Sequence, residues 1–249
     1  MILADHAHEP EEVTHDTLLC GRVKLIQPAR GFRSSLDPIL LAGFIHAPYG
    51  HFLDIGCGTG ALSFLLLARD PAATGLGVEI QPRLAGLAAR SVAANGFDAR
   101  FAVMAADVRQ TGLVPRASFD LVVSNPPFRP LGKGVLPPHT ERSLAHHEVA
   151  LTLTEWLAVA QSALRPDGRL AAIFPADRLD EMRAALAARA LAMTRLRMVQ
   201  AQTGGRANRF CFEAQQSALV AKTQTEAPLV VHKQGRYSAE VRAMLGEEP

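Results

Sequence analysis

The sequence is poor in cysteine and shows no metal-binding spacing. Its three cysteines, Cys20, Cys57 and Cys211, are far apart, and an odd, scattered set argues against a disulfide-stapled secreted domain. No Cys-x-x-Cys pair or His/Cys group has zinc-site spacing. His146 and His147 are adjacent, so a helix would point them in different directions. We therefore expect no bound metal.

Long apolar runs and a basic leader are also missing. The longest apolar run, residues 61–68, is too short to cross a bilayer. Residues 1–19 hold five acidic residues and neither Lys nor Arg, which is unlike a secretory signal. These absences predict a cytoplasmic protein without a membrane segment.

The composition is that of a globular chain with a moderately basic body. With 249 residues, of which 48% are hydrophobic, the chain can build one sizeable core. We predict a flexible acidic arm at 1–20 and a single domain at 21–249, with its core at about 51–222. Residues 20–249 carry 26 basic and 19 acidic residues, a net charge of +7. This charge is compatible with a nucleic-acid partner, and equally with an ordinary solvated surface.

Strand-like and helix-like segments alternate along most of the chain. This order predicts an α/β protein with a doubly wound, mostly parallel sheet and helices on both faces. Ligands of such sheets bind beyond the carboxyl ends of the strands. The expected strands are 23–26, 52–55, 75–80, 100–104, 119–124, 169–174, 195–201, 209–215 and a further candidate at 217–222. The expected helices are 37–45, 61–69, 82–95, 148–164 and 179–190.

A glycine-rich turn follows the strand at 52–55. Gly56, Gly58 and Gly60 stand at alternate positions after Asp54, which lets the main chain turn sharply and approach a ligand. A carboxylate at this place would repel a pyrophosphate and suits a cationic ligand, such as a sulfonium amino acid. The spacing also differs from the Gly-x-Gly-x-x-Gly of dinucleotide enzymes. A tight strand-to-helix turn without a ligand is the alternative.

Two further acids follow the next strands in order. Glu79 ends the strand at 75–80 and could accept hydrogen bonds from ribose hydroxyls. Asp107 follows the strand at 100–104 and could accept one from an adenine amine. Either acid alone could be a surface charge. Three acids at successive strand ends, counting Asp54, indicate a nucleoside-type site.

A rigid Asn-Pro-Pro-Phe turn ends the strand at 119–124. An exocyclic amine is a poor nucleophile because its lone pair is delocalised into the ring. The Asn125 side-chain oxygen and the Pro126 carbonyl could bind both of its N–H groups and turn the lone pair toward a methyl donor. Pro127 stiffens the turn, and Phe128 could stack on a flat substrate. Such catalysis needs positioning and electrostatics, and neither a metal nor a strong base.

These motifs resemble those of class I S-adenosylmethionine-dependent methyltransferases. The resemblance covers residues 51 to about 222 and implies a Rossmann-like, seven-stranded sheet whose last strand is antiparallel. Asn-Pro-Pro-Phe is similar to the signature of enzymes that methylate amino groups. The cofactor-binding residues that it implies are Asp54, Gly56, Cys57, Gly58, Gly60, Glu79, Ile80, Asp107, Val108 and Asn125.

The flanking segments resemble one branch, the tRNA1(Val) adenine-N6 methyltransferases. They are residues 27–42, 142–148, 228–232 and 235–241. This resemblance implies an adenine of a tRNA anticodon loop as the substrate, flipped into the site. Basic residues at the rim of the site could then hold RNA phosphates, although each could equally be a solvated surface charge. These candidates are Arg30, Arg33, Lys133, Arg142, His146 and His147.

Other functions remain open at this stage. Methylation of a protein glutamine uses the same signature, but those enzymes usually carry an N-terminal helical bundle, and about 50 residues precede Asp54 here. A small-molecule O-methyltransferase is disfavoured by Asn-Pro-Pro-Phe. An NAD-dependent oxidoreductase is disfavoured by the glycine spacing and by Asp54. A non-catalytic binding module is disfavoured by the intact Asn-Pro-Pro-Phe turn.

Overall fold

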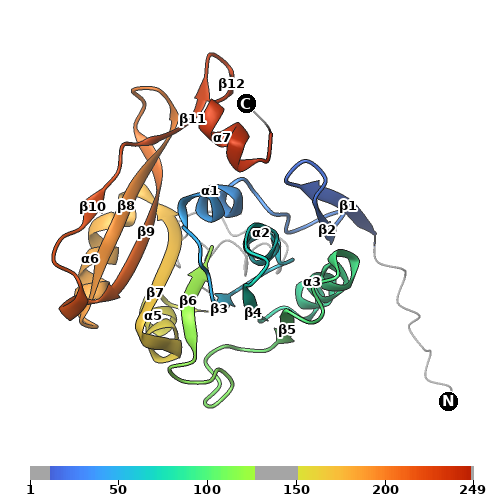
Figure 1. Cartoon of the computed structure of the whole chain (residues 1–249), viewed down its shortest axis with the longest axis horizontal. Coiled ribbons are helices and arrows are strands. Elements are labelled where there is room, and N and C mark those ends of the chain that lie inside the picture. The colour runs from blue at the N-terminus through green and yellow to red at the C-terminus, as the bar shows by residue number, and fades with distance from the viewer. Residues whose placement is uncertain (1–11, 127–150, 248–249) are drawn as a thin grey trace, which may run out of the picture.

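The computed structural model describes residues 12–126 and 151–247, and this part of the chain forms an α/β fold (Figure 1). A ten-stranded sheet runs through it. Its strands are β3 (His51–Ile55), β4 (Thr74–Glu79), β5 (Phe101–Ala105), β6 (Phe119–Ser124), β7 (Leu164–Pro175), β8 (Leu191–Gln202), β9 (Ala207–Gln216), β10 (Gln224–Thr225), β11 (Leu229–Lys233) and β12 (Arg236–Tyr237).

The strand order confirms the predicted fold class. Along the sheet it is β12-β11-β8-β9-β7-β6-β3-β4-β5, with β10 beside β8. The seven strands from β5 to β8 form the doubly wound core, and β9 runs antiparallel to both β7 and β8. Three short strands, β10, β11 and β12, extend the described sheet past β8, so it is wider than the seven strands implied by the resemblance.

Helices cover both faces of the sheet. On one face α1 (Asp37–Phe44), α2 (Ala61–Arg69) and α7 (Ala239–Met244) share an apolar cluster, to which α3 (Pro82–Asn95) adds Val92. On the other face α5 (Leu153–Ala163) and α6 (Leu179–Ala187) pack on the sheet through Trp156 and Met182. Residues 61–67 of α2 are all buried, as their apolar run predicts. In the described part of the chain, no helix is long and apolar enough to span a membrane.

Two sequence predictions are corrected. Residues 13–18, which we placed in a flexible arm, form the strand β1 (Val13–Leu18), paired with β2 (Val23–Pro28). The charge of Asp16 is compatible with this strand because Gln27 and Arg33 donate hydrogen bonds to its carboxylate. The candidate strand at 217–222 is wrong, because the chain leaves the sheet after β9 in a short 3₁₀ turn, η2 (Ser217–Leu219).

The start of α5 is set by a capping box. The Thr152 side chain accepts a hydrogen bond from the Glu155 backbone N–H, and the Glu155 carboxylate accepts one from the Thr152 backbone N–H. This reciprocal pair stops the helix from extending toward earlier residues. The first residues of the predicted helix, 148–150, lie outside the described residues.

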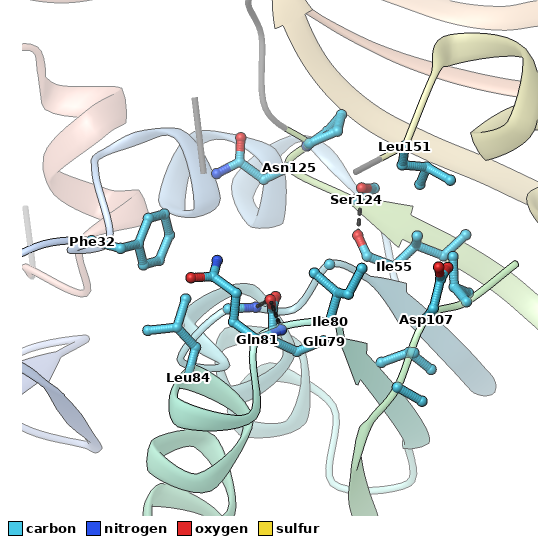
Figure 2. Close-up of a pocket in the computed structure, with 16 residues that line it drawn as sticks. Phe32, Ile55, Glu79, Ile80, Gln81, Leu84, Asp107, Ser124, Asn125 and Leu151 are labelled. Carbon is cyan, nitrogen blue, oxygen red and sulfur yellow. Dashed lines mark hydrogen bonds between the residues drawn. The ribbon is translucent and has the colours of Figure 1, made fainter. Parts of the chain in front are cut away.

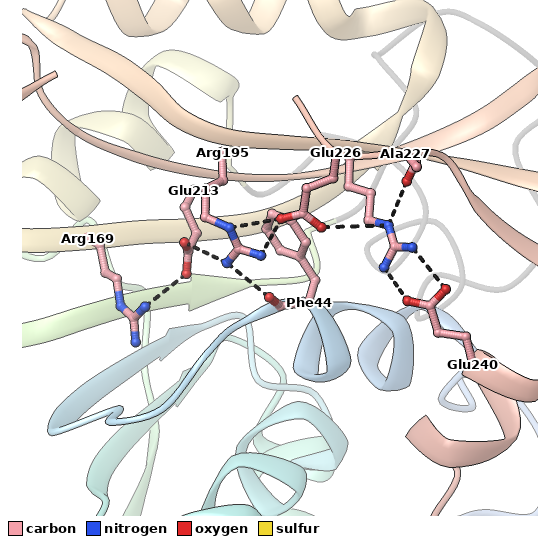
Figure 3. Close-up of polar contacts among 8 residues, drawn as sticks. Phe44, Arg169, Arg195, Glu213, Glu226, Ala227 and Glu240 are labelled. Carbon is pink, nitrogen blue, oxygen red and sulfur yellow. Dashed lines mark hydrogen bonds and ion pairs between the residues drawn. The ribbon is translucent and has the colours of Figure 1, made fainter. Parts of the chain in front are cut away.

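A row of alternating arginine and glutamate side chains fastens the later strands to the helices (Figure 3). It runs from β7 across β9 and β8 to α7. Arg195 lies near its middle: its guanidinium is 3.0 Å from the Glu213 carboxylate and also donates to the Phe44 carbonyl at the end of α1. Glu213 is 4% exposed, so its charge depends on these partners. The members of the row are Arg169, Glu213, Arg195, Glu226, Arg197 and Glu240.

Candidate functional site

A cavity opens at the carboxyl ends of β3, β4, β5 and β6, where a doubly wound sheet is expected to bind its ligand (Figure 2). Its empty space, including the open mouth, is about 740 Å³. A smaller cavity of about 330 Å³ shares Phe32, Gly56 and Asn125 with it. The larger cavity is lined by Phe32, Ile55, Gly56, Gly58, Val78, Glu79, Ile80, Gln81, Leu84, Ala106, Asp107, Val108, Ser124, Asn125, Pro126 and Leu151.

Two positions of the glycine-rich turn, Gly58 and Gly60, accommodate only glycine. Gly58 has a φ of +57°, and a Cβ atom there would lie 3.0 Å from the Phe32 ring. Gly60 has a φ of +90°, and a Cβ atom there would lie 2.4 Å from the Phe64 ring. Both conformations are strained for residues other than glycine. The turn therefore brings bare main chain against the cavity, as its sequence predicts.

Asp54 is buried beneath this turn, in the wall of the smaller cavity. Its carboxylate accepts a hydrogen bond from the Ser63 hydroxyl at 2.6 Å. Burial raises the pKa of Asp54 to about 7, although the Ser63 hydrogen bond partly offsets this effect. A buried carboxylate with one hydroxyl partner is suited to a cationic group in the cavity beside it. Cys57 and Thr59 line the same cavity.

Glu79 connects the ends of two strands. Its carboxylate accepts hydrogen bonds from the Gly58 N–H and the Gln81 N–H, each at 2.9 Å. Glu79 is 5% exposed, and this burial raises the pKa of its carboxyl. The carboxylate is therefore held in place at the cavity wall, next to Ile80. A fixed acceptor of this kind can bind neighbouring hydroxyl groups.

Asp107 lines the cavity after β5 and is paired with Arg109. The Arg109 guanidinium donates to both carboxylate oxygens, at 2.6 Å for the closest contact. These hydrogen bonds lower the pKa of Asp107, so its carboxylate is ionised. Val108, beside it, supplies an apolar wall. The arginine was not expected from the sequence.

Asn125 directly follows β6, where the sequence predicts a group that binds the substrate amine. The Ser124 hydroxyl donates to the Ile55 carbonyl at 2.7 Å, which fixes the end of β6 against β3. The Asn125 Oδ1 atom is buried and has no hydrogen-bond partner among the described residues. Because buried acceptors are normally paired, this atom is suited to a donor from a ligand. Pro126 lines the cavity beside it. Pro127 and Phe128 lie outside the described residues.

The residues expected at an RNA-binding rim have different positions. Arg30 is exposed. Arg33 donates to Asp16, to the Thr14 hydroxyl and to the Pro28 carbonyl, and so ties β1 to the segment after β2. The remaining candidates, Lys133, Arg142, His146 and His147, lie outside the described residues. Among the described residues, no group of three or more His, Cys, Asp or Glu side chains is arranged to hold a metal.

Several residues of the site were not expected. Phe32 comes from the segment after β2 and lines both cavities. Gln81 has a buried Oε1 atom without a partner among the described residues. Ser63 lies on the buried face of α2 and holds Asp54. A polar residue in an otherwise apolar helix could have indicated Ser63. Phe32 could not be found from local pattern because its contact with Gly58 joins distant parts of the chain.

A doubly wound sheet with a glycine-rich turn, buried acids and an asparagine at neighbouring strand ends is the architecture of a class I methyltransferase. A family model for the methyltransferase small domain matches residues 37–189. The chain belongs to this family. Enzymes of this class use S-adenosylmethionine as the methyl donor, and the residues fit it: Asp54 suits a cation, and Gln81 and Thr59 supply buried oxygens that have no hydrogen-bond partner in the described part of the chain.

Similar proteins include both nucleic-acid and protein methyltransferases. A tRNA1(Val) (adenine(37)-N6)-methyltransferase of Porphyromonas gingivalis is 35% identical over 187 residues, covering 72% of each chain. A release factor glutamine methyltransferase of Cereibacter sphaeroides is 33% identical over 150 residues, 55% of this chain and 53% of that protein. The solved structure of a predicted O-methyltransferase from Agrobacterium tumefaciens, 23% identical, shares the fold with a TM-score of 0.65 over 84% of this chain and 94% of its own.

Proposed function

We propose that this protein transfers a methyl group from S-adenosylmethionine to the exocyclic N6 amine of an adenine in tRNA. The observation that carries the proposal is the buried Oδ1 atom of Asn125 at the wall of the cavity, which no donor from residues 12–126 or 151–247 satisfies. The name and 35% identity of the P. gingivalis relative support an adenine of tRNA as the substrate. A tRNA substrate also supports the expected cytoplasmic location.

Asn125 would act by binding and orienting the amine. Its Oδ1 atom accepts one N–H of the amine, and the Pro126 carbonyl accepts the other. With both hydrogens held, the nitrogen lone pair is drawn out of the ring and points into the cavity. The energetic gain comes from preorganised acceptors, which need no rearrangement when the bond to the methyl group forms. The Ser124–Ile55 hydrogen bond keeps the acceptors in register with the glycine-rich turn.

The cofactor, when bound, supplies an activated methyl group on a sulfonium. Asp54, which lines the smaller cavity, would bind its cationic part, and Glu79, which lines the larger one, would accept hydrogen bonds from its hydroxyls. Ile80 and Val108 exclude water from the apolar wall. Transfer would break the sulfonium–methyl bond, leave S-adenosylhomocysteine as the product and release one N–H proton of the amine to solvent. None of these residues therefore needs to act as an acid or a base.

Methylation of a protein glutamine is the second candidate. The nitrogen of a carboxamide is also planar, weakly nucleophilic and carries two N–H groups, so the same acceptors would serve it. The 33% identity to a release factor glutamine methyltransferase favours keeping this candidate. The two functions are separated by the substrate that takes up the methyl group.

The test is methyl transfer from isotopically labelled cofactor to bulk tRNA or to release factor. We expect label in tRNA, and about 100-fold slower transfer for Asn125→Ala, since one preorganised hydrogen bond is worth about that factor. Cofactor affinity should change less than tenfold. A matched amide-to-alanine control is Gln224→Ala, because Gln224 is exposed on β10. Label in release factor alone, or an Asn125→Ala variant as fast as the control, would contradict the proposal.

A further inference from the structure

Two hairpin ends lie beyond the carboxyl edge of the sheet (Figure 1). The cavity is lined by residues at this same edge. The strand register gives the height of the hairpin ends. Ser124 at the end of β6 is level with Ala172, and Pro175 is level with Arg209. On β8, Val199 is level with Arg209, and the strand continues to Gln202. The end of β8 therefore lies six residues beyond the level of Ser124: three along β7, from Ala172 to Pro175, and three along β8, from Val199 to Gln202. At about 3.3 Å per residue this is about 20 Å.

The first hairpin joins β8 to β9 through residues 203–206. The second joins β11 to β12 through residues 234–235, and it reaches the same height because His232 of β11 is level with Gln202. We name these two ends together, residues 198–212 and 229–238, the hairpin wall.

The hairpin wall is basic. Its residues include no Asp or Glu. Arg206, Lys233 and Arg236 are exposed, and no ion pair to any of the three occurs among the described residues. The nearby acids are engaged elsewhere, since Asp37 pairs with Arg209 and Glu240 with Arg197. Three exposed cations lie on one raised edge, and the acids nearest to them in the described fold are paired with other arginines, so this edge attracts a polyanion.

An exposed aromatic pair lies within the same wall. Tyr237 is 40% exposed, although most large apolar side chains of the described fold are buried. Its ring stacks on His232, with centroids 4.9 Å apart and planes inclined by 23°. Stacked rings flanked by Lys233 and Arg236 are typical of surfaces that bind unpaired bases or ribose.

The hairpin wall is so far from the cavity that only a macromolecular substrate could contact both. From β6 to β8 the sheet has three strand steps, and from β6 to β11 four. At about 4.8 Å per step, the wall stands roughly 14–19 Å to the side of Asn125. A free nucleoside in the cavity could not reach it. A polynucleotide whose target base enters the cavity would pass beside it.

We infer that the hairpin wall is a docking surface for the RNA substrate: Arg206, Lys233 and Arg236 bind phosphates while Tyr237 stacks on an unpaired base or ribose. This inference rests on the proposed function. The surface gives affinity for the RNA body and leaves the chemistry at Asn125 unchanged, because phosphate contacts position a nucleic acid without reading the reacting base.

The test compares two triple variants that remove the same charge. The first is Arg206→Gln, Lys233→Gln and Arg236→Gln. The control is Arg90→Gln, Arg116→Gln and Lys222→Gln, which are exposed residues on α3, before β6 and before β10. Both are measured for KM and kcat with tRNA, for tRNA binding at several salt concentrations, and for cofactor binding.

We expect the wall variant to raise the KM for tRNA at least tenfold, with kcat at saturating tRNA and cofactor binding within twofold of wild type. Its salt dependence of binding should be shallower by about two to three in log–log slope, and the control's should change much less. Equal effects of both triple variants would overturn the inference. If the wild-type protein methylates tRNA and both triple variants have its KM and its affinity for tRNA, the wall inference fails and the proposed function stands.

Tyr237 supplies an independent arm of the same test. Tyr237→Ala should weaken tRNA binding about tenfold, whereas Tyr237→Phe, which retains the ring, should bind like wild type. The phenylalanine variant separates the effect of the ring from that of the hydroxyl. Binding by Tyr237→Ala equal to that of wild type would remove stacking from the inference. If wild-type protein methylates no tRNA, the proposed function fails first, and the wall inference fails with it.

Discussion

Replacing Asp54 by asparagine should affect stability and cofactor binding in opposite directions. Burial raises the pKa of Asp54 from 3.8 to about 7. A raised carboxyl pKa contributes stability that is fully present below the unfolded value and is lost as pH rises through the folded value. The ionised form at pH 8 therefore costs about 4 kcal/mol, because three pKa units correspond to about 1.4 kcal/mol each.

Asp54→Asn removes this cost and retains the acceptor for Ser63. We expect its free energy of unfolding to exceed that of wild type at pH 8 by up to about 4 kcal/mol, and the difference to vanish near pH 4. Urea unfolding at pH 4 to 8 measures it. Asp98→Asn is the matched control, because Asp98 is an exposed carboxylate after α3.

Cofactor binding should change in the other direction. If the Asp54 carboxylate binds the cationic part of the cofactor, a proton must leave before binding, so wild-type affinity should fall up to tenfold for each pH unit below about 7. Calorimetric titration of the cofactor measures this dependence, which Asp54→Asn should flatten while weakening binding at pH 8. An Asn variant that is less stable at pH 8 and binds cofactor like wild type would refute both the burial and the binding role.

Three further outcomes follow from single contacts. Asp16→Asn should loosen the segment that carries Phe32 and raise the cofactor Kd severalfold in a fluorescence titration; in a Phe32→Ala background it should add nothing, and an additive effect would count against this coupling. Gly60→Ala should destabilise the protein by about 2 kcal/mol or more, because of its φ of +90° and the Phe64 ring; an unchanged urea midpoint would argue otherwise. Arg195→Gln should cost about 3 kcal/mol by weakening the pairing of a buried carboxylate on β9, and a melting temperature within 1–2 °C of wild type would disprove it.

Sequence pattern located most of the fold because its elements carry strong local signals. The predicted bounds of α2, α3 and β6 agree with the structure. A buried apolar run specifies α2, and a first-turn proline and a terminal Asn-Gly delimit α3. The strands β10, β11 and β12 were missed because they are too short to show a recognisable alternation of apolar and polar residues. β1 was missed because Asp16 suggested a solvated arm, whereas distant partners satisfy its charge.

The residues of the candidate site that lie at strand ends could be predicted from the sequence. Asp54 and Glu79 lie at the carboxyl ends of their strands, and Asp107 and Asn125 follow theirs closely. Since the carboxyl ends of these four strands meet, topology alone brings the residues together. Phe32, Ser63 and Arg109 could not be assigned in this way, because their roles depend on tertiary contacts with Gly58, Asp54 and Asp107. The roles of Pro127 and Phe128 remain predictions.

The central claim is that the amide oxygen of Asn125 orients an adenine amine of tRNA for methyl transfer. The most direct test is mass spectrometry of nucleosides from tRNA incubated with the protein and S-adenosylmethionine. The account predicts N6-methyladenosine with wild-type protein, and almost none with Asn125→Ala that still binds the cofactor. A methyl group on another nucleoside, or equal yields of N6-methyladenosine from the two proteins, would contradict it.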